Sequence, residues 1–219
     1  MKVLVFDTET TGLPPKGAKL GVTPIKDFPY VVQLSYILYD TDKHTIIVSN
    51  DHIINMPEGV ELSEESVKIH GITRDKMKNC GVSMKHALEL FEICARAANV
   101  LVAHNLDFDK RMLFVEARRN GIYSLPLHPS SGKEMVCTMK TSVETCAIEA
   151  VNKRTGEKYF KYPTLSELHK HLFGIMPTGV HNAFVDILVC LRCYVYIQHE
   201  QDVLLVSKKF QRQFERFMI

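Results

Sequence analysis

Two acidic residues, Asp7 and Glu9, follow an apolar run at the start of the chain and are the first candidates for chemistry. Residues 1–6 are apolar with β-branched side chains, which predicts a strand buried on both faces. Side chains alternate along a strand, so Asp7 and Glu9 point to one face and Thr8 to the other. Carboxylate oxygens are the ligands that Mg²⁺ and Mn²⁺ prefer. The pair predicts a hard-cation site, although an isolated Asp-x-Glu also fits a turn-capping aspartate and a solvated glutamate.

Two later segments place more acidic residues beside the ends of expected elements. A short strand at residues 99–103 leads into a helix that carries Asp109 in its first turn. An apolar helix spans about 181–198, with His181 at its mouth and Asp186 in its second turn. Functional groups are commonly displayed at such element ends. The chain therefore offers four carboxylates and one histidine for a shared site.

These residues stand in three ordered motifs. The motifs resemble those of the DnaQ-like 3′–5′ exonucleases of the DEDDh group, which have a ribonuclease H-like fold. The first motif is Phe-Asp-Thr-Glu-Thr-Thr-Gly-Leu at residues 6–13. In the second, at residues 103–109, the family aspartate falls on Asp109 because it follows the aromatic Phe108, and Asp107 is not the match.

The third motif separates the histidine group of this family from its tyrosine group. His181 stands five positions ahead of Asp186, as in the histidine group. The tyrosine group places its residue four positions ahead, where this chain has Asn182. Weaker similarities follow elsewhere, and the resemblance covers roughly residues 1–198.

The resemblance implies a two-metal hydrolysis of phosphodiesters. Two Mg²⁺ or Mn²⁺ ions about 3.5–4 Å apart would clamp the attacking and leaving oxygens. The four carboxylates that would hold these ions are Asp7, Glu9, Asp109 and Asp186. His181 would accept the proton of the attacking water, because an imidazole with a pKa near 6.5 is largely neutral at working pH. The products would be nucleoside 5′-monophosphates released from single-stranded DNA or RNA ends. Because clustered carboxylates repel one another, metal binding is expected to stabilise the fold.

The resemblance also implies contacts to the terminal nucleotide. The candidates are Thr10, Thr11, Leu13, His70 and Phe108. Leu13 would wedge against the base, and His70 and Phe108 would flank it, an arrangement that tolerates any base. The residue types alone leave two alternatives open, in which Phe108 packs in the core and His70 is a turn or capping residue.

The coarse pattern predicts an α/β fold with a mixed five-stranded sheet flanked by helices, as the ribonuclease H-like resemblance also implies. Residues 31–39 and 45–54 continue an antiparallel meander from the first strand. A helix follows at 83–98, and strand and helix then alternate. Three antiparallel strands are therefore followed by two parallel ones.

We expect a single exonuclease domain over residues 1–219, with its core at 1–198 and a C-terminal helix at about 203–217. Phenylalanines recur at spacings of four and three in that helix, among basic residues. The spacing favours a face that packs on the core, with a solvated charged side, over a nucleic-acid-binding stripe.

Two segments interrupt the pattern. Residues 14–29 contain four of the nine prolines and leave directly from the acidic turn, so we expect them to rim the substrate groove. Residues 141–162 carry a basic cluster, which either contacts phosphates or belongs to an ordinary exposed loop. The cluster consists of Lys153, Arg154, Lys158 and Lys161.

The composition of the chain limits its size class, its compartment and the nucleic acids that it can bind. A chain of 219 residues with 46% hydrophobic content can bury one sizeable core. A net charge of +2 argues against the broad basic surface that grips duplex DNA and favours short single strands. Six cysteines without a secretory signal predict reduced thiols inside the cell, and Cys190 and Cys193 fit buried core thiols better than zinc ligands. No apolar run is long enough to span a membrane.

Three functions fit these observations. The first is a metal-dependent 3′–5′ exonuclease. The second is a proofreading subunit bound to a polymerase, which the short stretch after Asp186 disfavours because it leaves no long tether. The third is an inactive nucleic-acid-binding scaffold, which usually lacks a motif residue, whereas all five are present here. The motifs do not distinguish DNA from RNA, the cellular compartment, the pathway, or a homodimer from a monomer.

Overall fold

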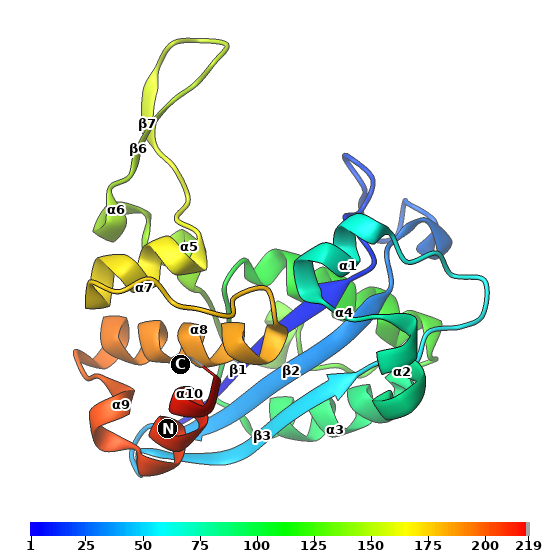
Figure 1. Ribbon diagram of the computed structural model, residues 1–219, viewed down its shortest axis with the longest axis horizontal. Helices are drawn as coiled ribbons and strands as arrows, with labels where there is room; N and C mark the ends of the chain where they lie inside the picture. Colours follow the sequence, from blue (N-terminus) through cyan, green and yellow to red (C-terminus); the bar gives the residue numbers. More distant parts are fainter. Residues whose placement is uncertain (218–219) are drawn as a thin grey trace.

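A mixed five-stranded sheet lies at the centre of the computed structural model, which describes residues 1–217 (Figure 1). The strand order is β3-β2-β1-β4-β5. The first three strands pair antiparallel, and β4 and β5 run parallel to β1. This arrangement confirms the sheet predicted from the sequence. The strands span Lys2–Thr10 (β1), Val31–Asp40 (β2), Thr45–Ile53 (β3), Val100–Ala103 (β4) and Glu134–Cys137 (β5).

Helices cover both faces of the sheet. Helices α3 and α4 pack on one face and α8 and α10 on the other, and α7 packs against α8 (Figure 1). The helices of the described residues span Glu64–His70 (α1), Arg74–Cys80 (α2), Met84–Ala97 (α3), Leu106–Arg119 (α4), Thr138–Thr141 (α5), Val143–Cys146 (α6), Leu165–Phe173 (α7), Ala183–His199 (α8), Val203–Val206 (α9) and Lys208–Phe217 (α10).

Strand β1 is enclosed between the two helical layers. Leu4 and Phe6 belong to the core beneath α3 and α4, whereas Val3 and Val5 belong to the core beneath α8, and all four are fully buried. Burying apolar surface from both faces fixes the strand firmly, at about 25 cal/mol per Å². The strand continues to Thr10, so the acidic residues lie within paired backbone rather than after its end.

The start of α8 differs from the prediction. The helix begins at Ala183, so Asp186 lies in its first turn and the expected second-turn position is wrong. Two residues stop the helix from starting earlier. His181 has a left-handed backbone (φ 70°), and the Asn182 side chain caps the helix by accepting a hydrogen bond from the Phe184 N–H (3.1 Å).

The single C-terminal helix predicted at 203–217 is also wrong, because the structure has two helices there. Ser207 adopts an extended backbone between α9 and α10. Its hydroxyl accepts a hydrogen bond from the Phe210 N–H (3.4 Å) and so caps the second helix. Phe210 and Phe214 are buried against the sheet, as their spacing predicted.

The two interrupting segments have definite structures. Residues 141–162 contain α6 and a β-hairpin made of β6 (Glu149–Val151) and β7 (Lys158–Phe160), which rises from the body of the molecule (Figure 1). The sequence left two alternatives open for the basic cluster of this region, phosphate contacts or an ordinary exposed loop, and it did not predict the hairpin. Cys190 and Cys193 are free, buried thiols in α8, in agreement with the sequence. Across residues 1–217, no helix combines the length and apolar character needed to cross a membrane.

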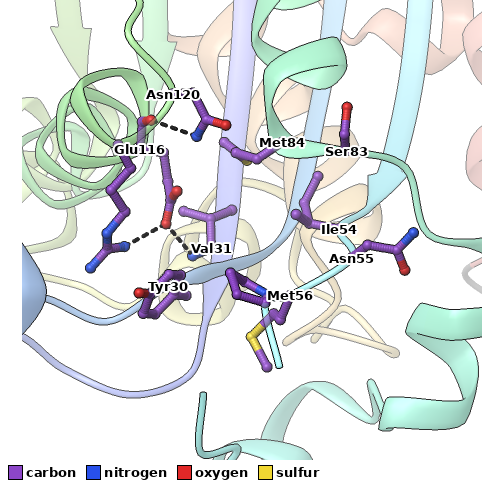
Figure 2. Close-up of a pocket in the computed structure, with 11 residues that line it drawn as sticks. Tyr30, Val31, Ile54, Asn55, Met56, Ser83, Met84, Glu116 and Asn120 are labelled. Carbon is purple, nitrogen blue, oxygen red and sulfur yellow. Dashed lines mark hydrogen bonds and ion pairs between the residues drawn. The ribbon is translucent and has the colours of Figure 1, made fainter. Parts of the chain in front are cut away.

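The segment 14–29 is held to the end of α4 by Arg119. The Arg119 guanidinium donates to the carbonyl oxygens of Ile25 (2.8 Å), Phe28 (2.6 Å) and Pro29 (2.9 Å). Glu116 accepts a hydrogen bond from the same guanidinium (2.6 Å). It also accepts one from the Val31 N–H (3.1 Å), which Figure 2 shows. Both side chains of this ion pair are nearly buried. The pair joins the segment, strand β2 and helix α4.

Replacing Arg119 with Ala should release this segment and leave Glu116 as an unpaired buried charge. Loss of one partner of a buried pair costs about 3–5 kcal/mol. We expect that fall in the free energy of unfolding, measured by urea denaturation, together with new proteolytic cleavage within residues 14–29. Arg118→Ala removes an exposed neighbour and is the matched control. Equal stability of the two variants would contradict the anchoring role of Arg119.

Candidate functional site

Three carboxylates converge where β1 meets the start of α8. Asp7 and Glu9 from β1 and Asp186 from α8 present oxygens that all lie within 4.8 Å of one another. The second oxygen of Asp186, Oδ1, is buried and has no hydrogen-bond partner among the described residues. A buried carboxylate oxygen without a partner is costly in an apolar setting unless a cation occupies the position. The donor set therefore fits a divalent cation that prefers oxygen ligands.

Asp109 reaches the same region from the opposite face of the sheet. It lies in the first turn of α4 and is buried (2% exposed). Its Oδ1 accepts hydrogen bonds from the Thr8 N–H (3.0 Å) and the Thr8 hydroxyl (2.8 Å). Thr8 points away from its acidic neighbours in β1, so it can bind a carboxylate on the α4 side. The structure thus does not place Asp109 in the three-residue group, but fixes it beside that group.

Burial raises the pKa of all four carboxyl groups, and repulsion between carboxylates adds to the increase at Asp7, Glu9 and Asp109. Burial is the main cause in each case, because it disfavours the charged form. It raises the pKa of Asp7 well above its usual range, and the charges of Asp109, Asp186 and Glu9 add to the increase. The pKa of Glu9 rises to about 8, and those of Asp109 and Asp186 rise to about 7. The acidic site is therefore electrostatically unfavourable without a cation.

Gln33 positions the helix that carries Asp186. It is fully buried in β2, directly opposite Glu9. Its Oε1 accepts a hydrogen bond from the Ala183 N–H (3.3 Å), the first residue of α8. Its Nε2 donates to Asp51 (2.7 Å) on β3. The motifs did not identify Gln33. An amide side chain in a strand of mostly apolar residues could have indicated a buried polar contact at this position.

His181 contacts the acidic group through its backbone. The His181 N–H donates to Asp186 Oδ2 (3.2 Å), and this bond ties the loop before α8 to the carboxylate. The His181 side chain itself is exposed. The left-handed backbone of His181 turns the chain sharply just before the start of α8, where the sequence predicted the histidine.

The predicted substrate residues in the turn after β1 fall into two kinds. The Thr10 hydroxyl donates to the Gly12 carbonyl (2.7 Å), and the Thr11 hydroxyl accepts from the Tyr30 N–H (3.1 Å). These two side chains therefore shape the turn. Leu13 instead projects into solvent with 83% of its surface exposed, which is unusual for a leucine at the rim of a buried acidic group.

His70 and Phe108 are less accessible. His70 is buried, and its Nδ1 accepts from the Ile72 N–H (3.0 Å) within the turn that ends α1. Burial is the main reason that its pKa lies below the ordinary value. Phe108 is half-buried and packs on the core beneath α4, beside Asp109. Both alternatives left open by the sequence, a turn histidine and a core phenylalanine, describe contacts that these side chains make.

His104 is a further polar link, half-buried, that the motifs did not assign. Its Nδ1 accepts from the Thr138 hydroxyl (3.0 Å), and its Nε2 donates to the Pro163 carbonyl (3.1 Å). Burial lowers the pKa of His104 to about 4, so the ring is neutral. Asp107, the aspartate that the motif excluded, pairs instead with Lys140 on α5 (2.5 Å). These bonds connect the end of β4 to the chain that follows the β6–β7 hairpin.

A cavity of about 580 Å³ lies away from the acidic group. It opens between the ends of β2 and β3 and helices α3 and α4 (Figure 2). Val31, Ile54 and Met84 line it, together with Glu116 and other residues. The four carboxylates are not among its lining residues, so cavity size alone does not locate the site.

The sequence profile of the RNase T exonuclease family matches residues 4–194. The chain belongs to this family. Its members are DEDD-type 3′–5′ exonucleases, which use divalent metals. The match spans all three acidic motifs and the five-stranded sheet.

Individual relatives agree with this assignment. A ribonuclease T from Histophilus somni (strain 129Pt) is 31% identical over 114 residues, which is 46% of this chain and 51% of the relative. The chain thus matches about half the length of that protein.

Solved structures of E. coli Exonuclease I share the fold. The zinc-bound complex with single-stranded DNA superposes with a TM-score of 0.66 at 17% identity, over 98% of this chain and 42% of the other. The complex with a dA16 oligonucleotide gives 0.65 at the same identity and coverage.

Gln33→Leu should weaken the site without touching a carboxylate. It leaves the Ala183 N–H without its acceptor, so we expect a loss of about 1–3 kcal/mol in the free energy of unfolding. We also expect a smaller rise in melting temperature on adding Mg²⁺, measured by differential scanning calorimetry. Ser35→Ala is the control, because Ser35 is buried in the same strand and also donates to Asp51 (2.7 Å). A Gln33 variant with the full Mg²⁺ response would show that this link does not position Asp186.

The raised pKa values predict a distinctive pH dependence of stability. Because the four carboxyl groups have higher pKa values folded than unfolded, the folded chain binds more protons between about pH 4 and pH 8. Without metal, the free energy of unfolding should therefore fall as the pH rises through this window. Added Mg²⁺ should restore stability most strongly at the upper end, since protons compete with the cation.

The measurement is the melting temperature across this pH range, in EDTA and in Mg²⁺. A change of 1 kcal/mol moves the melting temperature of a chain of this size by about 2–4 °C. Asp186→Asn should flatten the EDTA curve, because it removes one titrating group and relieves repulsion. Parallel curves with and without Mg²⁺ would exclude cation binding by these carboxylates.

Proposed function

We propose that this chain is a metal-dependent 3′–5′ exonuclease of the DEDDh type. It releases nucleoside 5′-monophosphates from the ends of single-stranded DNA or RNA. Two observations at one place carry the proposal: Asp7, Glu9 and Asp186 converge, and a buried oxygen of Asp186 has no hydrogen-bond partner among residues 1–217. Family membership supplies the reaction class, and this geometry supports an intact site.

The carboxylates are the cation ligands in this proposal. Asp7, Glu9 and Asp186 would hold one divalent cation, and Asp109, fixed beside them by Thr8, would help to hold a second. When bound, such cations make water more acidic and stabilise negative charge on the departing 3′ oxygen. Mg²⁺ and Mn²⁺ are the expected ions, because all four ligands are carboxylates.

The other residues position the reactants and move the proton. His181 accepts the proton of the attacking water through its exposed imidazole, and its backbone bond to Asp186 keeps the loop at the site. The exposed side chain of Leu13 contacts the terminal base, and half-buried Phe108 supports the nucleotide beside Asp109. Thr10 and Thr11 shape the turn that presents Leu13.

Single-stranded substrates fit this site better than duplexes. The net charge of +2 provides no extended basic surface. The zinc-bound E. coli Exonuclease I structure that shares the fold is a complex with single-stranded DNA, and the Histophilus somni relative is named a ribonuclease. The first assay should therefore include both DNA and RNA substrates.

The test is the hydrolysis of 5′-labelled single-stranded DNA and RNA oligonucleotides with Mg²⁺, Mn²⁺ or EDTA. We expect metal-dependent, stepwise shortening from the 3′ end. His181→Ala should lower kcat about 10²–10⁴-fold, the usual value of a general base. Asp186→Asn should remove activity, because it takes away a cation ligand.

Asp107→Asn is the matched control for the carboxylates. Asp107 lies two residues before Asp109 in the same helical turn but pairs with Lys140, so this variant should keep nearly full activity. If the wild type fails to shorten either oligonucleotide with any metal, the exonuclease proposal is wrong. If Asp186→Asn retains wild-type rates, the assignment of the carboxylates is wrong.

A further inference from the structure

The β6–β7 hairpin exposes aromatic side chains on both of its faces. Tyr159 is 51% exposed and Phe160 is 42% exposed. As consecutive strand residues, they point to opposite faces of the ribbon. Val151, at 56%, and Tyr162, at 57% just beyond the hairpin, extend the exposed apolar surface. Clustered exposed apolar groups of this kind mark a surface that binds something.

The tip of the hairpin is basic and ordered. The Asn152 side chain accepts from the backbone N–H groups of Arg154 (2.9 Å) and Thr155 (3.3 Å), and its carbonyl accepts from the Gly156 N–H (2.8 Å). The turn therefore has a defined shape and displays Lys153 and Arg154 outward. Within residues 1–217, neither of these two cations forms an ion pair, whereas Lys158 pairs with Glu149 on the strands.

The base of the hairpin is joined to the acidic edge of the sheet. Pro163, three residues after β7, accepts the hydrogen bond from His104, which follows β4. Strands β4 and β1 are parallel, so their carboxyl ends lie at the same edge. In Figure 1 the hairpin and the segment 14–29, which follows the end of β1, project from the same side of the molecule.

We propose that the β6–β7 hairpin is a second binding surface for single-stranded nucleic acid, which holds the strand upstream of the nucleotide being removed. Its exposed aromatic rings stack on bases, and Lys153 and Arg154 at its tip contact phosphates. Both interactions are independent of sequence, and a single strand supplies unstacked bases and charge together. The inference rests on the proposed exonuclease function, because it concerns the same substrate.

The test compares oligonucleotides that differ in length. Tyr159→Ala/Phe160→Ala should raise KM about tenfold for a single strand of about 16 nucleotides, because each lost stack weakens binding. The same variant should leave kcat, and the hydrolysis of a dinucleotide, unchanged, since neither depends on the hairpin. Arg118→Ala/Tyr123→Ala removes one basic and one aromatic residue, both exposed at the far end of α4, and should behave as wild type.

Salt dependence distinguishes a phosphate contact from a folding defect. Lys153→Ala/Arg154→Ala should reduce the slope of log affinity against log salt by about 0.7 for each lost phosphate contact. Affinity is measured by fluorescence anisotropy of a labelled single strand in EDTA, where no hydrolysis occurs. An unchanged slope and unchanged affinity in both hairpin variants would overturn the proposal, and would direct the search to a protein partner for this surface.

Failure of the two proposals is distinguishable. If the wild type hydrolyses both oligonucleotides and the hairpin variants do so with the same KM, only the hairpin proposal fails. If the wild type hydrolyses neither, the exonuclease proposal fails and anisotropy alone decides whether the hairpin binds nucleic acid. In that case, weaker binding by the hairpin variants supports the hairpin surface, and equal binding overturns it.

Discussion

The structure depends on keeping four mutually repelling carboxyl groups in one partly buried place. Lost hydration favours protonating all four, as their raised pKa values show, and repulsion adds to this at Asp7, Glu9 and Asp109. What opposes this is the rigidity of β1, whose apolar residues are packed from both faces. The acidic edge can be unfavourable because the sheet beneath it has no room to relax.

Polar groups within the core hold the acidic residues and their neighbouring segments in position. Thr8 fixes Asp109, Gln33 fixes the first turn of α8, and the Arg119–Glu116 pair fixes the segment that leaves from the acidic turn. Each of these groups bridges two elements that are distant in sequence. A buried hydrogen bond of this kind is expensive to break and so holds its partners in one arrangement.

Much of this architecture was predictable, and the failures have local causes. The sheet and its mixed topology followed from alternating and continuous apolar runs, and Phe210 and Phe214 were correctly placed by their spacing. The start of α8 and the break at Ser207 were missed, because they depend on a left-handed residue and a serine cap rather than on periodicity. The sequence did not predict the positioning roles of Thr8, Gln33 and His104, because their hydrogen-bond partners come close only in the folded chain.

The acidic edge joins two separate cores, and this has a consequence for when it exists. Asp109 comes from the layer of α4, whereas Asp186 comes from the layer of α8 on the other face. Helix α8 begins at residue 183, late in the chain. A nascent chain that has left the ribosome only as far as α7 already contains all five strands of the central sheet but lacks Asp186. The acidic group is therefore completed only after both helical layers have been synthesised, so an intermediate with a finished sheet still lacks one of the four carboxylates.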